Sequence, residues 1–320
     1  MMGHAWLKHR EALLAVVIIL MIGAIGSRAP SFVSPGNLVE MFNDTAILII
    51  LALGQMMVLL TKGIDLSMAA NLALTGMIVA LLNAHYPGIP VVALLALATL
   101  LGLLMGVING LLVWRLGIPA IVVTLGTMSL YRGITYILLG DQALNHYPES
   151  FAWFGQGYVW GALSFEFALF ILLAAAFTFL LHKTNFGRRT YAIGNNPTGA
   201  WFSGINVKRH NLVLFALVGL MAGLAAVLLT SRLGSTRPTL AMGWELAVVT
   251  MAVLGGVNIL GGSGSMPGVI IAAFLMGLVT FGLSLLNVPG IVMSVIIGAM
   301  LIVVISLPII TRRMMQRRRC

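Results

Sequence analysis

Apolar segments close to the length of a membrane-spanning helix recur along most of this chain, and they limit its fold more than any other feature. A helix needs about 20 mostly apolar residues to cross a bilayer. Hydrophobic residues make up 60% of the 320 residues and charged residues only 8%, too little polar surface to cover a water-soluble globule of this size. We therefore predict an all-α polytopic membrane protein, one transmembrane domain over residues 1–320, with about ten spans near residues 12–26, 46–60, 66–84, 89–114, 118–139, 165–181, 212–231, 245–260, 267–286 and 288–307.

The basic residues are distributed unevenly over the loops between these spans. If the N-terminus is cytoplasmic, fourteen Lys and Arg residues fall on the cytoplasmic side, whereas only Arg28, Arg232 and Arg237 fall outside. Cytoplasmic loops carry such an excess, and an even number of spans places both basic termini on one side. We therefore expect both termini in the cytoplasm. The net charge of +10 orients the chain and does not indicate nucleic-acid binding, because the basic residues are scattered over short loops and a tail that would contact anionic lipid.

The first span has a second interpretation. Residues 8–26 are basic and then apolar, which is also the pattern of a cleaved signal peptide. No small-x-small cleavage site follows cleanly at "GAIGSRAP", and loss of the first helix would spoil the even count, so we favour an uncleaved anchor. The single cysteine, Cys320, excludes an internal disulfide and a cysteine cluster for a metal ion.

Two spans contain glycines at every fourth position. They are Gly102, Gly106 and Gly110 in one span and Gly219 and Gly223 in another. Lipid tails provide no hydrophobic drive for helices to associate, so small residues that let backbones approach are the expected packing device. We interpret these glycines as structural.

Three segments between spans exceed about fifteen residues: 27–45 and 140–164 on the outer side, and 182–211 in the cytoplasm. The last, "HKTNFGRRTYAIGNNPTGAWFSGINVKRHN", contains Lys and Arg but no Asp or Glu. A simple connector needs only a few residues. The length and pattern of this loop therefore favour a docking surface for a soluble partner; the alternative is an inert basic loop anchored on lipid.

Within this loop the sequence predicts a short helix. Asn196 can cap it, Pro197 suits its first position and Gly204 can close it. Such a helix has about two turns and is roughly 10 Å long. It would present Trp201 and Phe202 on a surface otherwise rich in polar atoms.

The same stretch, "TNFGRRTYAIGNNPTGAWFSGINV", resembles the cytoplasmic coupling loop of carbohydrate-importing ABC transporter permeases, a family that includes ribose, xylose, rhamnose and autoinducer-2 importers. Three further motifs of this family are similar to "TKGIDLS" at 61–67, "NGLLVWRLGIPAIVVTLGTMSLYRG" at 109–133 and "LGGVNILGGSGSMPG" at 254–268. The resemblance covers roughly residues 45–305. The shared positions of the coupling loop are Thr184, Gly187, Tyr191, Ala192, Gly194, Asn196, Ala200, Gly204, Ile205 and Asn206.

The chain departs from the family pattern at several positions. "MAAN" at 68–71 stands where the family commonly has G-S, Trp201 replaces a usual basic or polar residue, and Thr198 replaces a common acid. These changes concern the identity of the sugar and the partner surface. The variant "AANLALTG" is most similar to the rhamnose-type members.

Three groups of residues are candidates for function. The resemblance implies contact with a cytoplasmic ATPase through the coupling loop. Two turns rich in glycine are candidate gate turns, and polar residues within spans could line a sugar path, although helix–helix hydrogen bonds explain any one of them equally well. The groups are, for coupling, Gly194, Asn196, Pro197, Gly199, Ala200, Trp201 and Gly204; for the gate turns, Gly63, Asp65, Gly261 and Gly262; and for the path, Gln55, Asn71, Asn109, Thr124, Thr127 and Arg132.

Two of these residues also have simpler interpretations. Asp65 follows Lys62 at a predicted helix junction, where a carboxylate that caps the next helix is enough to explain it. Arg132 lies either within a span, where a charge is costly and usually functional, or near the outer interface, where its side chain could reach water.

Three classes of function compete: an ABC permease, an ion-coupled secondary transporter or channel, and an intramembrane enzyme. Coupled carriers normally bury carboxylates within spans, and all eight acids of this chain are predicted at loops or helix ends. Neither H-E-x-x-H nor G-x-S-x-G is present, and no phosphate-binding G-x-x-x-x-G-K-[ST] loop exists. We therefore expect a non-enzymatic permease subunit in a bacterial inner membrane, without catalytic residues, metal or cofactor of its own.

The resemblance implies the partners of such a subunit. Separate ATPase subunits would use ATP and Mg, a second permease, identical or related, would enclose the path, and an extracytoplasmic binding protein would deliver a monosaccharide or similar polyol.

Overall fold

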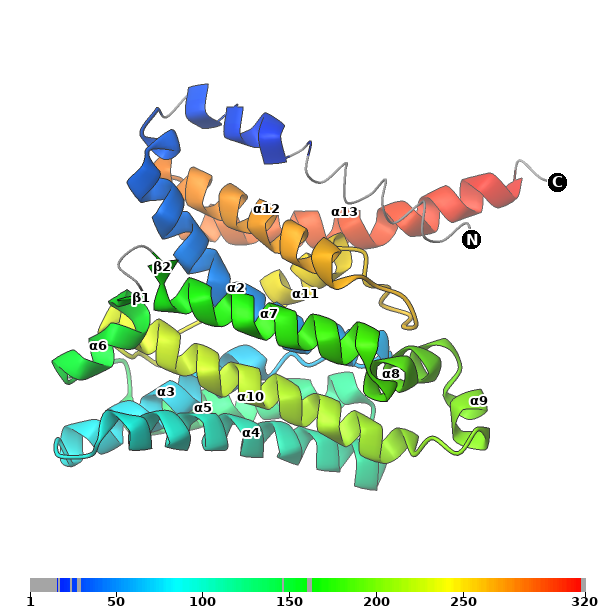
Figure 1. Cartoon of the computed structure of the whole chain (residues 1–320), viewed down its shortest axis with the longest axis horizontal. Coiled ribbons are helices and arrows are strands. Elements are labelled where there is room, and N and C mark those ends of the chain that lie inside the picture. The colour runs from blue at the N-terminus through cyan, green and yellow to red at the C-terminus, as the bar shows by residue number, and fades with distance from the viewer. Residues whose placement is uncertain are drawn as a thin grey trace.

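The chain folds into helices that run roughly along one direction, as a computed structural model shows for residues 16, 18–23, 25–27, 30–145, 147–159 and 163–317 (Figure 1). The only strands among these residues form a two-stranded antiparallel ribbon, so the all-α prediction is confirmed. The elements are η1 (Pro30–Val33), α2 (Pro35–Leu60), α3 (Met68–His85), α4 (Val91–Leu116), α5 (Ala120–Leu139), α6 (Glu149–Gln156), β1 (Tyr158–Val159), β2 (Leu163–Ser164), α7 (Phe165–Lys183), α8 (Asn185–Asn195), α9 (Pro197–Phe202), α10 (Val207–Leu233), α11 (Trp244–Leu254), α12 (Met266–Leu285) and α13 (Gly290–Arg317).

Seven described helices are long and apolar enough to cross a membrane: α2, α3, α4, α5, α7, α10 and α12. Shorter apolar helices lie at Ile18–Ser27 and Trp244–Leu254, and the part Gly290–Val303 of α13 is also apolar; the sequence predicted a further span at each of these three places. The first of those predictions, 12–26, lies partly outside the described residues. The count of ten and the side on which the termini lie stay predictions.

The predicted outer loop 27–45 is wrong, because α2 already begins at Pro35. Ser34 caps the helix by accepting a hydrogen bond from Asn37 N, and Pro35 occupies the first turn, where its missing N–H costs nothing. Its polar N-terminal residues obscured this start in the sequence. Segment 140–164 contains α6 and the β1–β2 ribbon, and segment 182–211 contains α8 and α9.

Helix α2 forms the centre of the molecule. Almost every residue from Thr45 to Leu60 is buried, because α7, α10, α11 and α12 surround this part of the helix. In Figure 1 it passes behind α7 toward the end where α8 and α9 lie, whereas α6 and the ribbon lie at the opposite end.

Helices α4 and α10 pack antiparallel through the two glycine series. A Cβ atom on Gly102 would lie 2.5 Å from the carbonyl oxygen of Gly219, and one on Gly106 would lie 2.3 Å from that of Phe215. One on Gly223 would lie 2.5 Å from the carbonyl oxygen of Ala98. The packing role predicted for these glycines is therefore confirmed.

Two non-helical segments enter the interior from opposite ends of the bundle. Residues 61–67 join α2 to α3, and three of them, Gly63, Asp65 and Ser67, are buried. Residues 234–243 join α10 to α11, with Thr236 fully buried. Helix α11 has 11 residues and is therefore only about 16 Å long, about half of a bilayer core.

Apart from Arg132, Arg232 and Arg237, which lie elsewhere, seven basic residues of the described segments gather at the α8–α9 end of the bundle. They lie at the ends of α2, α4 and α7, in α8 and at the start of α10, and they are Lys62, Arg115, Lys183, Arg188, Arg189, Lys208 and Arg209.

We predict that Gly106→Ala destabilises the folded protein, because its Cβ would collide with the backbone of α10 and overpacking of this kind costs roughly 1–3 kcal/mol. The thermal unfolding midpoint of the purified protein in detergent would measure the loss. Gly298→Ala on α13 is the control, since a Cβ there meets nothing within 4 Å. Equal midpoints for the two variants would contradict the close contact of α4 with α10.

Candidate functional site

The short helix predicted after Asn196 is present as α9. Asn196 Oδ1 accepts a hydrogen bond of 3.0 Å from Gly199 N, and Pro197 occupies the first turn. The helix ends at Phe202, and Gly204 follows with a φ of 81°, in the left-handed region that favours glycine. The capping residues therefore act as the sequence predicted.

Helix α9 presents an aromatic pair at the end of the bundle. Trp201 is 62% exposed and Phe202 is 76% exposed, and their ring centroids lie 4.9 Å apart. Ala200, which was predicted as a contact residue, is instead buried against its own chain and cannot form part of this surface.

The polar groups around the pair are basic. Arg188, Arg189, Lys208 and Arg209 are exposed in the neighbouring helices, and no acid occurs between 182 and 211. The surface therefore combines exposed aromatic rings with positive charge and would suit an acidic protein partner.

Helix α8 was not predicted. Thr184 caps it, and Gly187, Thr190 and Gly194 are buried at spacings of three and four residues. This spacing is typical of one helix face and was a signal that the polar composition concealed. The loop is therefore two helices, of which α8 lies against the membrane helices and α9 projects from them (Figure 1).

The C-terminal end of α8 fits into a contact between the two predicted gate turns. Gly262 N donates a hydrogen bond of 2.9 Å to the carbonyl oxygen of Leu60, the last residue of α2. A Cβ on Gly194 would lie 1.9 Å from that oxygen and 2.4 Å from Gly262 N. Position 194 must therefore be glycine for the three backbones to meet.

Side chains of α8 reinforce this contact. Asn195 Nδ2 donates to the carbonyl oxygen of Gly262 at 3.3 Å, and the Tyr191 hydroxyl donates to that of Gly264 at 2.9 Å. Burial raises the pKa of Tyr191 to about 12, so the hydroxyl keeps the proton that it donates. We call this set of residues, Leu60, Tyr191, Gly194, Asn195, Gly262 and Gly264, the glycine junction.

The second turn of the junction depends on glycine conformation. Gly261 and Gly262 have φ values of 78° and 80°, which other residues rarely adopt. A Cβ on Gly261 would lie 2.6 Å from Cγ of Lys62. The structure thus brings the two predicted gate turns, far apart in the sequence, into direct contact.

Beyond the junction, Asp65 organises the segment that leads to α3. Its Oδ1 accepts hydrogen bonds from the backbone N and the hydroxyl of Ser67, at 2.8 and 2.7 Å, and Ser67 is the N-cap residue of α3. Asp65 is fully buried, so it supports the start of the helix from inside the protein and not at a surface.

Three residues predicted for the sugar path hold this segment, and their role in the path stays a prediction. Asn109 Nδ2 donates to the Ser67 hydroxyl at 2.7 Å, and the Thr124 hydroxyl donates to the Ile64 carbonyl at 3.0 Å. The Gln55 amide, oriented to satisfy both groups, pairs with the backbone N and O of Asp65 at 3.3 and 3.2 Å.

The remaining predicted path residues also have partners in the chain. Asn71 Nδ2 donates to the Gly102 carbonyl at 3.1 Å, and the Thr127 hydroxyl to that of Val123 at 3.1 Å. Arg132 Nη1 donates to the carbonyl oxygens of Pro238 and Leu240 at 2.6 and 2.8 Å, so its side chain is directed to segment 234–243. A role in the path stays a prediction for these residues.

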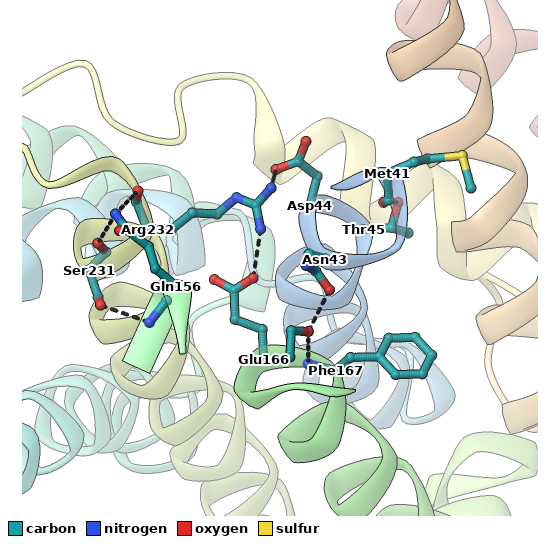
Figure 2. Close-up of polar contacts among 11 residues, drawn as sticks. Met41, Asn43, Asp44, Thr45, Gln156, Glu166, Phe167, Ser231 and Arg232 are labelled. Atoms are coloured by element: carbon teal, nitrogen blue, oxygen red, sulfur yellow. Dashed lines mark hydrogen bonds and ion pairs between the residues drawn. The ribbon is translucent and has the colours of Figure 1, made fainter. Parts of the chain in front are cut away.

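At the opposite end of the bundle, Arg232 joins three helices (Figure 2). Its guanidinium lies 2.8 Å from Asp44 Oδ1 of α2 and 2.8 Å from Glu166 Oε2 of α7. Glu166 is fully buried, and Asp44 lies well inside α2, so the prediction that all acids lie at loops or helix ends is wrong for Asp44. The positive charge of Arg232 compensates the charges of both carboxylates.

Among the described residues no cluster of three His, Cys, Asp or Glu side chains is placed to hold a metal ion.

Comparison with known proteins identifies the family and relatives of this chain. Residues 37–305 match the family model described as "Branched-chain amino acid transport system / permease component". The ribose import permease protein of Escherichia coli (strain K12) is 35% identical over 290 residues, 89% of this chain and 88% of its own.

Two further relatives cover similar shares. The D-allose transport system permease protein of the same strain is 32% identical over 91% of this chain and 89% of its own. The autoinducer 2 import system permease protein of Enterobacter sp. (strain 638) is 33% identical over 92% and 91%. No solved structure matches the chain.

We predict that Gly194→Ala opens the glycine junction, because the added methyl group cannot fit beside the Leu60 carbonyl. Amide hydrogen exchange at residues 258–264 should then become at least tenfold faster, since Gly262 N loses its acceptor. Gly199→Ala is the control: its Cβ would meet only the Asn196 side chain, at 3.2 Å. Unchanged exchange in Gly194→Ala would show that the three backbones do not pack as described.

Proposed function

Because the chain belongs to the family described as permease components of transport systems, we propose that it is the membrane subunit of a bacterial binding-protein-dependent ABC importer for a monosaccharide or related polyol. The family description names branched-chain amino acids, but the relatives that match about nine tenths of this chain are named for ribose, D-allose and autoinducer 2. These names favour a sugar-like cargo. They give no specific support to the rhamnose-type member that the "AANLALTG" variant suggested.

The observation that carries the proposal is the attachment of α9 to the membrane helices. Helix α9 projects an exposed aromatic pair, and α8 connects it to the glycine junction, where α2 ends and the turn before α12 lies. A surface helix fixed in this way can transmit a force applied from outside the membrane. A loop that only joined two membrane helices and bound no partner would not need such a fixed surface helix.

The energy source of the proposed importer is a separate ATPase. The chain contains no phosphate-binding loop. The ATPase would hold α9 in a groove that fits Trp201 and Phe202, with acidic side chains beside the four exposed basic residues. This assignment places the α8–α9 end in the cytoplasm and the Arg232 end outside, in agreement with the excess of Lys and Arg at the α8–α9 end.

A second permease subunit and an extracytoplasmic sugar-binding protein complete the proposed assembly. We include coupling through Gly194, Asn196, Pro197, Gly199, Trp201 and Gly204 in this proposal. Asn196, Pro197 and Gly204 shape the ends of α9. Gly194 belongs to the glycine junction, and Trp201 would contact the ATPase.

An ion-coupled secondary transporter is the alternative. Glu166, which is fully buried, and Asp44, which lies inside α2, remove one sequence argument against it, but both are paired with Arg232. The family match favours the ABC importer.

The proposal is tested by purification with the ATPase from neighbouring genes and reconstitution in liposomes. We predict that the complex takes up radiolabelled D-ribose or D-allose only with ATP and a sugar-loaded binding protein, and that the permease alone takes up neither.

In the double variant Trp201→Ala/Phe202→Ala, co-purification of the ATPase should fall at least tenfold, because the proposed contact surface is removed, while the unfolding midpoint of the permease stays unchanged.

The matched control is Leu286→Ala, which removes an exposed apolar side chain just after α12, at the other end of the bundle. It should leave co-purification unchanged. ATP-independent uptake by the permease alone would overturn the proposed function and favour the secondary transporter, and normal ATPase binding by the double variant would overturn the role of α9.

A further inference from the structure

One exposed face of α5 carries polar residues at a depth where lipid would otherwise surround it. Ser129 is exposed, Arg132 is half-buried, and a Cβ on either Gly126 or Gly133 would meet nothing within 4 Å. Tyr136 lies one turn further along the same face and is also exposed. The face is therefore open and carries polar groups among exposed apolar residues such as Val122, Leu125 and Ile137. By contrast, the exposed residue Leu172 of α7 has no such polar neighbours on its helix face.

These residues lie well inside the span. Helix α5 has 20 residues and so measures about 30 Å, the thickness of a bilayer core. Arg132 is seven residues from its end at Leu139, about 10 Å, and Ser129 is ten residues from it, about 15 Å. Both positions are too deep for the interface.

Segment 234–243 brings an acid to the same region. Arg132 binds the Pro238 and Leu240 carbonyls, and Glu245 follows five residues after Leu240, in the first turn of α11. Glu245 is nine residues from the end of α11 at Leu254, about 14 Å. It is therefore also at mid-membrane depth.

Glu245 has unused hydrogen-bonding capacity. Its Oε2 atom is buried and has no hydrogen-bond partner within the described part of the chain, and no ion pair of 4.0 Å or less joins Glu245 to Arg132 there. A buried carboxylate oxygen without a donor is costly. Because Glu245 as a whole is half-buried, a rotation of its side chain would present this oxygen to a ligand that donates hydrogen bonds, which would remove the cost.

Lipid cannot be the neighbour of this face. A carboxylate near the middle of the membrane and a guanidinium within its hydrocarbon core, both in partly exposed residues, are tolerated where they border water or another polar surface. The irregular segment 234–243 beside them meets the same requirement, because non-helical backbone at membrane depth is found only where protein covers it or water lines it.

We propose that Ser129, Arg132 and Glu245 form part of the wall of the transport path and bind the hydroxyl groups of a neutral sugar during its passage. This proposal rests on the proposed function. It adds Glu245, a carboxylate that belongs to none of the sequence motifs. A carboxylate only accepts hydrogen bonds and a guanidinium only donates them, whereas each sugar hydroxyl can do both. Adjacent hydroxyls can therefore bind Glu245 and Arg132 together, which a branched aliphatic side chain cannot do.

The first experiment tests whether water reaches this face, and it needs no knowledge of where the sugar binds. Ser129→Cys and Leu172→Cys would each be introduced with Cys320→Ser and reconstituted in the complete importer. During ATP-driven turnover, a membrane-impermeant sulfonated methanethiosulfonate should modify Cys at 129 at least tenfold faster than Cys at 172. Leu172 is 65% exposed and lies about 10 Å from the outer end of α7, so it is a lipid-facing control that is no deeper than Ser129.

The second experiment tests Glu245. Glu245→Gln should reduce uptake of radiolabelled D-ribose or D-allose at least tenfold, with membrane abundance and basal ATP hydrolysis within twofold of the unmodified importer. Glu149→Gln in α6, outside the spans, is the matched control and should retain uptake. Glu245→Asp, which keeps the carboxylate, should retain more uptake than Glu245→Gln.

The outcomes separate the inference from the function on which it rests. If the unmodified complex imports neither sugar, the proposed function fails. If it imports a sugar, then equal modification rates at 129 and 172, or normal uptake by Glu245→Gln, would each overturn the path wall described here.

Discussion

Backbone that leaves helical geometry inside a membrane protein must find new hydrogen-bond partners, because lipid supplies none. Two segments of this chain, 61–67 and 234–243, face this constraint, and α5 serves both of them. The Thr124 hydroxyl binds the Ile64 carbonyl in the first segment, and Arg132, eight residues further along the helix, binds two carbonyls in the second. Helix α5 therefore holds irregular backbone that enters from opposite ends of the bundle.

The glycine junction extends the same principle to the end of the bundle. The carbonyl of Leu60 at the end of α2 accepts a hydrogen bond from Gly262 N in the turn before α12. Gly194 lets α8 pack over this hydrogen bond. A movement of α8 must therefore displace both turns. Because segment 61–67 leads directly to α3, the same movement reaches a buried helix start that Asp65 and Asn109 hold.

Features that depend on local sequence were predicted well. The caps of α9, the apolar helices and the glycine faces of α4 and α10 follow from neighbouring residues or from helical spacing. The start of α2 was missed because its first residues are polar, although the Ser34 cap and Pro35 are local signals of a helix start, and α8 was missed because its buried face is made largely of glycine and threonine.

Contacts between distant residues could not be predicted in the same way. Nothing near Gly194 in the sequence indicates that it packs on Leu60 and Gly262, and Gln55, Asn109 and Thr124 are equally compatible with a path or with a structural role. Their partners are the backbone of Ile64 and Asp65 and the Ser67 hydroxyl, all in one turn, which only the folded chain brings within reach. The pairing of Glu166 with Arg232 likewise joins residues 66 positions apart.

The central claim is that the glycine junction transmits movement of α9 to α2 and to the turn before α12. The most direct measurement is the number of sugar molecules imported per ATP hydrolysed by the reconstituted complex, compared between the unmodified permease and Gly194→Ala. The account predicts that the variant still binds its ATPase and supports hydrolysis, while the ratio falls at least tenfold. A ratio equal to that of the unmodified complex would contradict the claim.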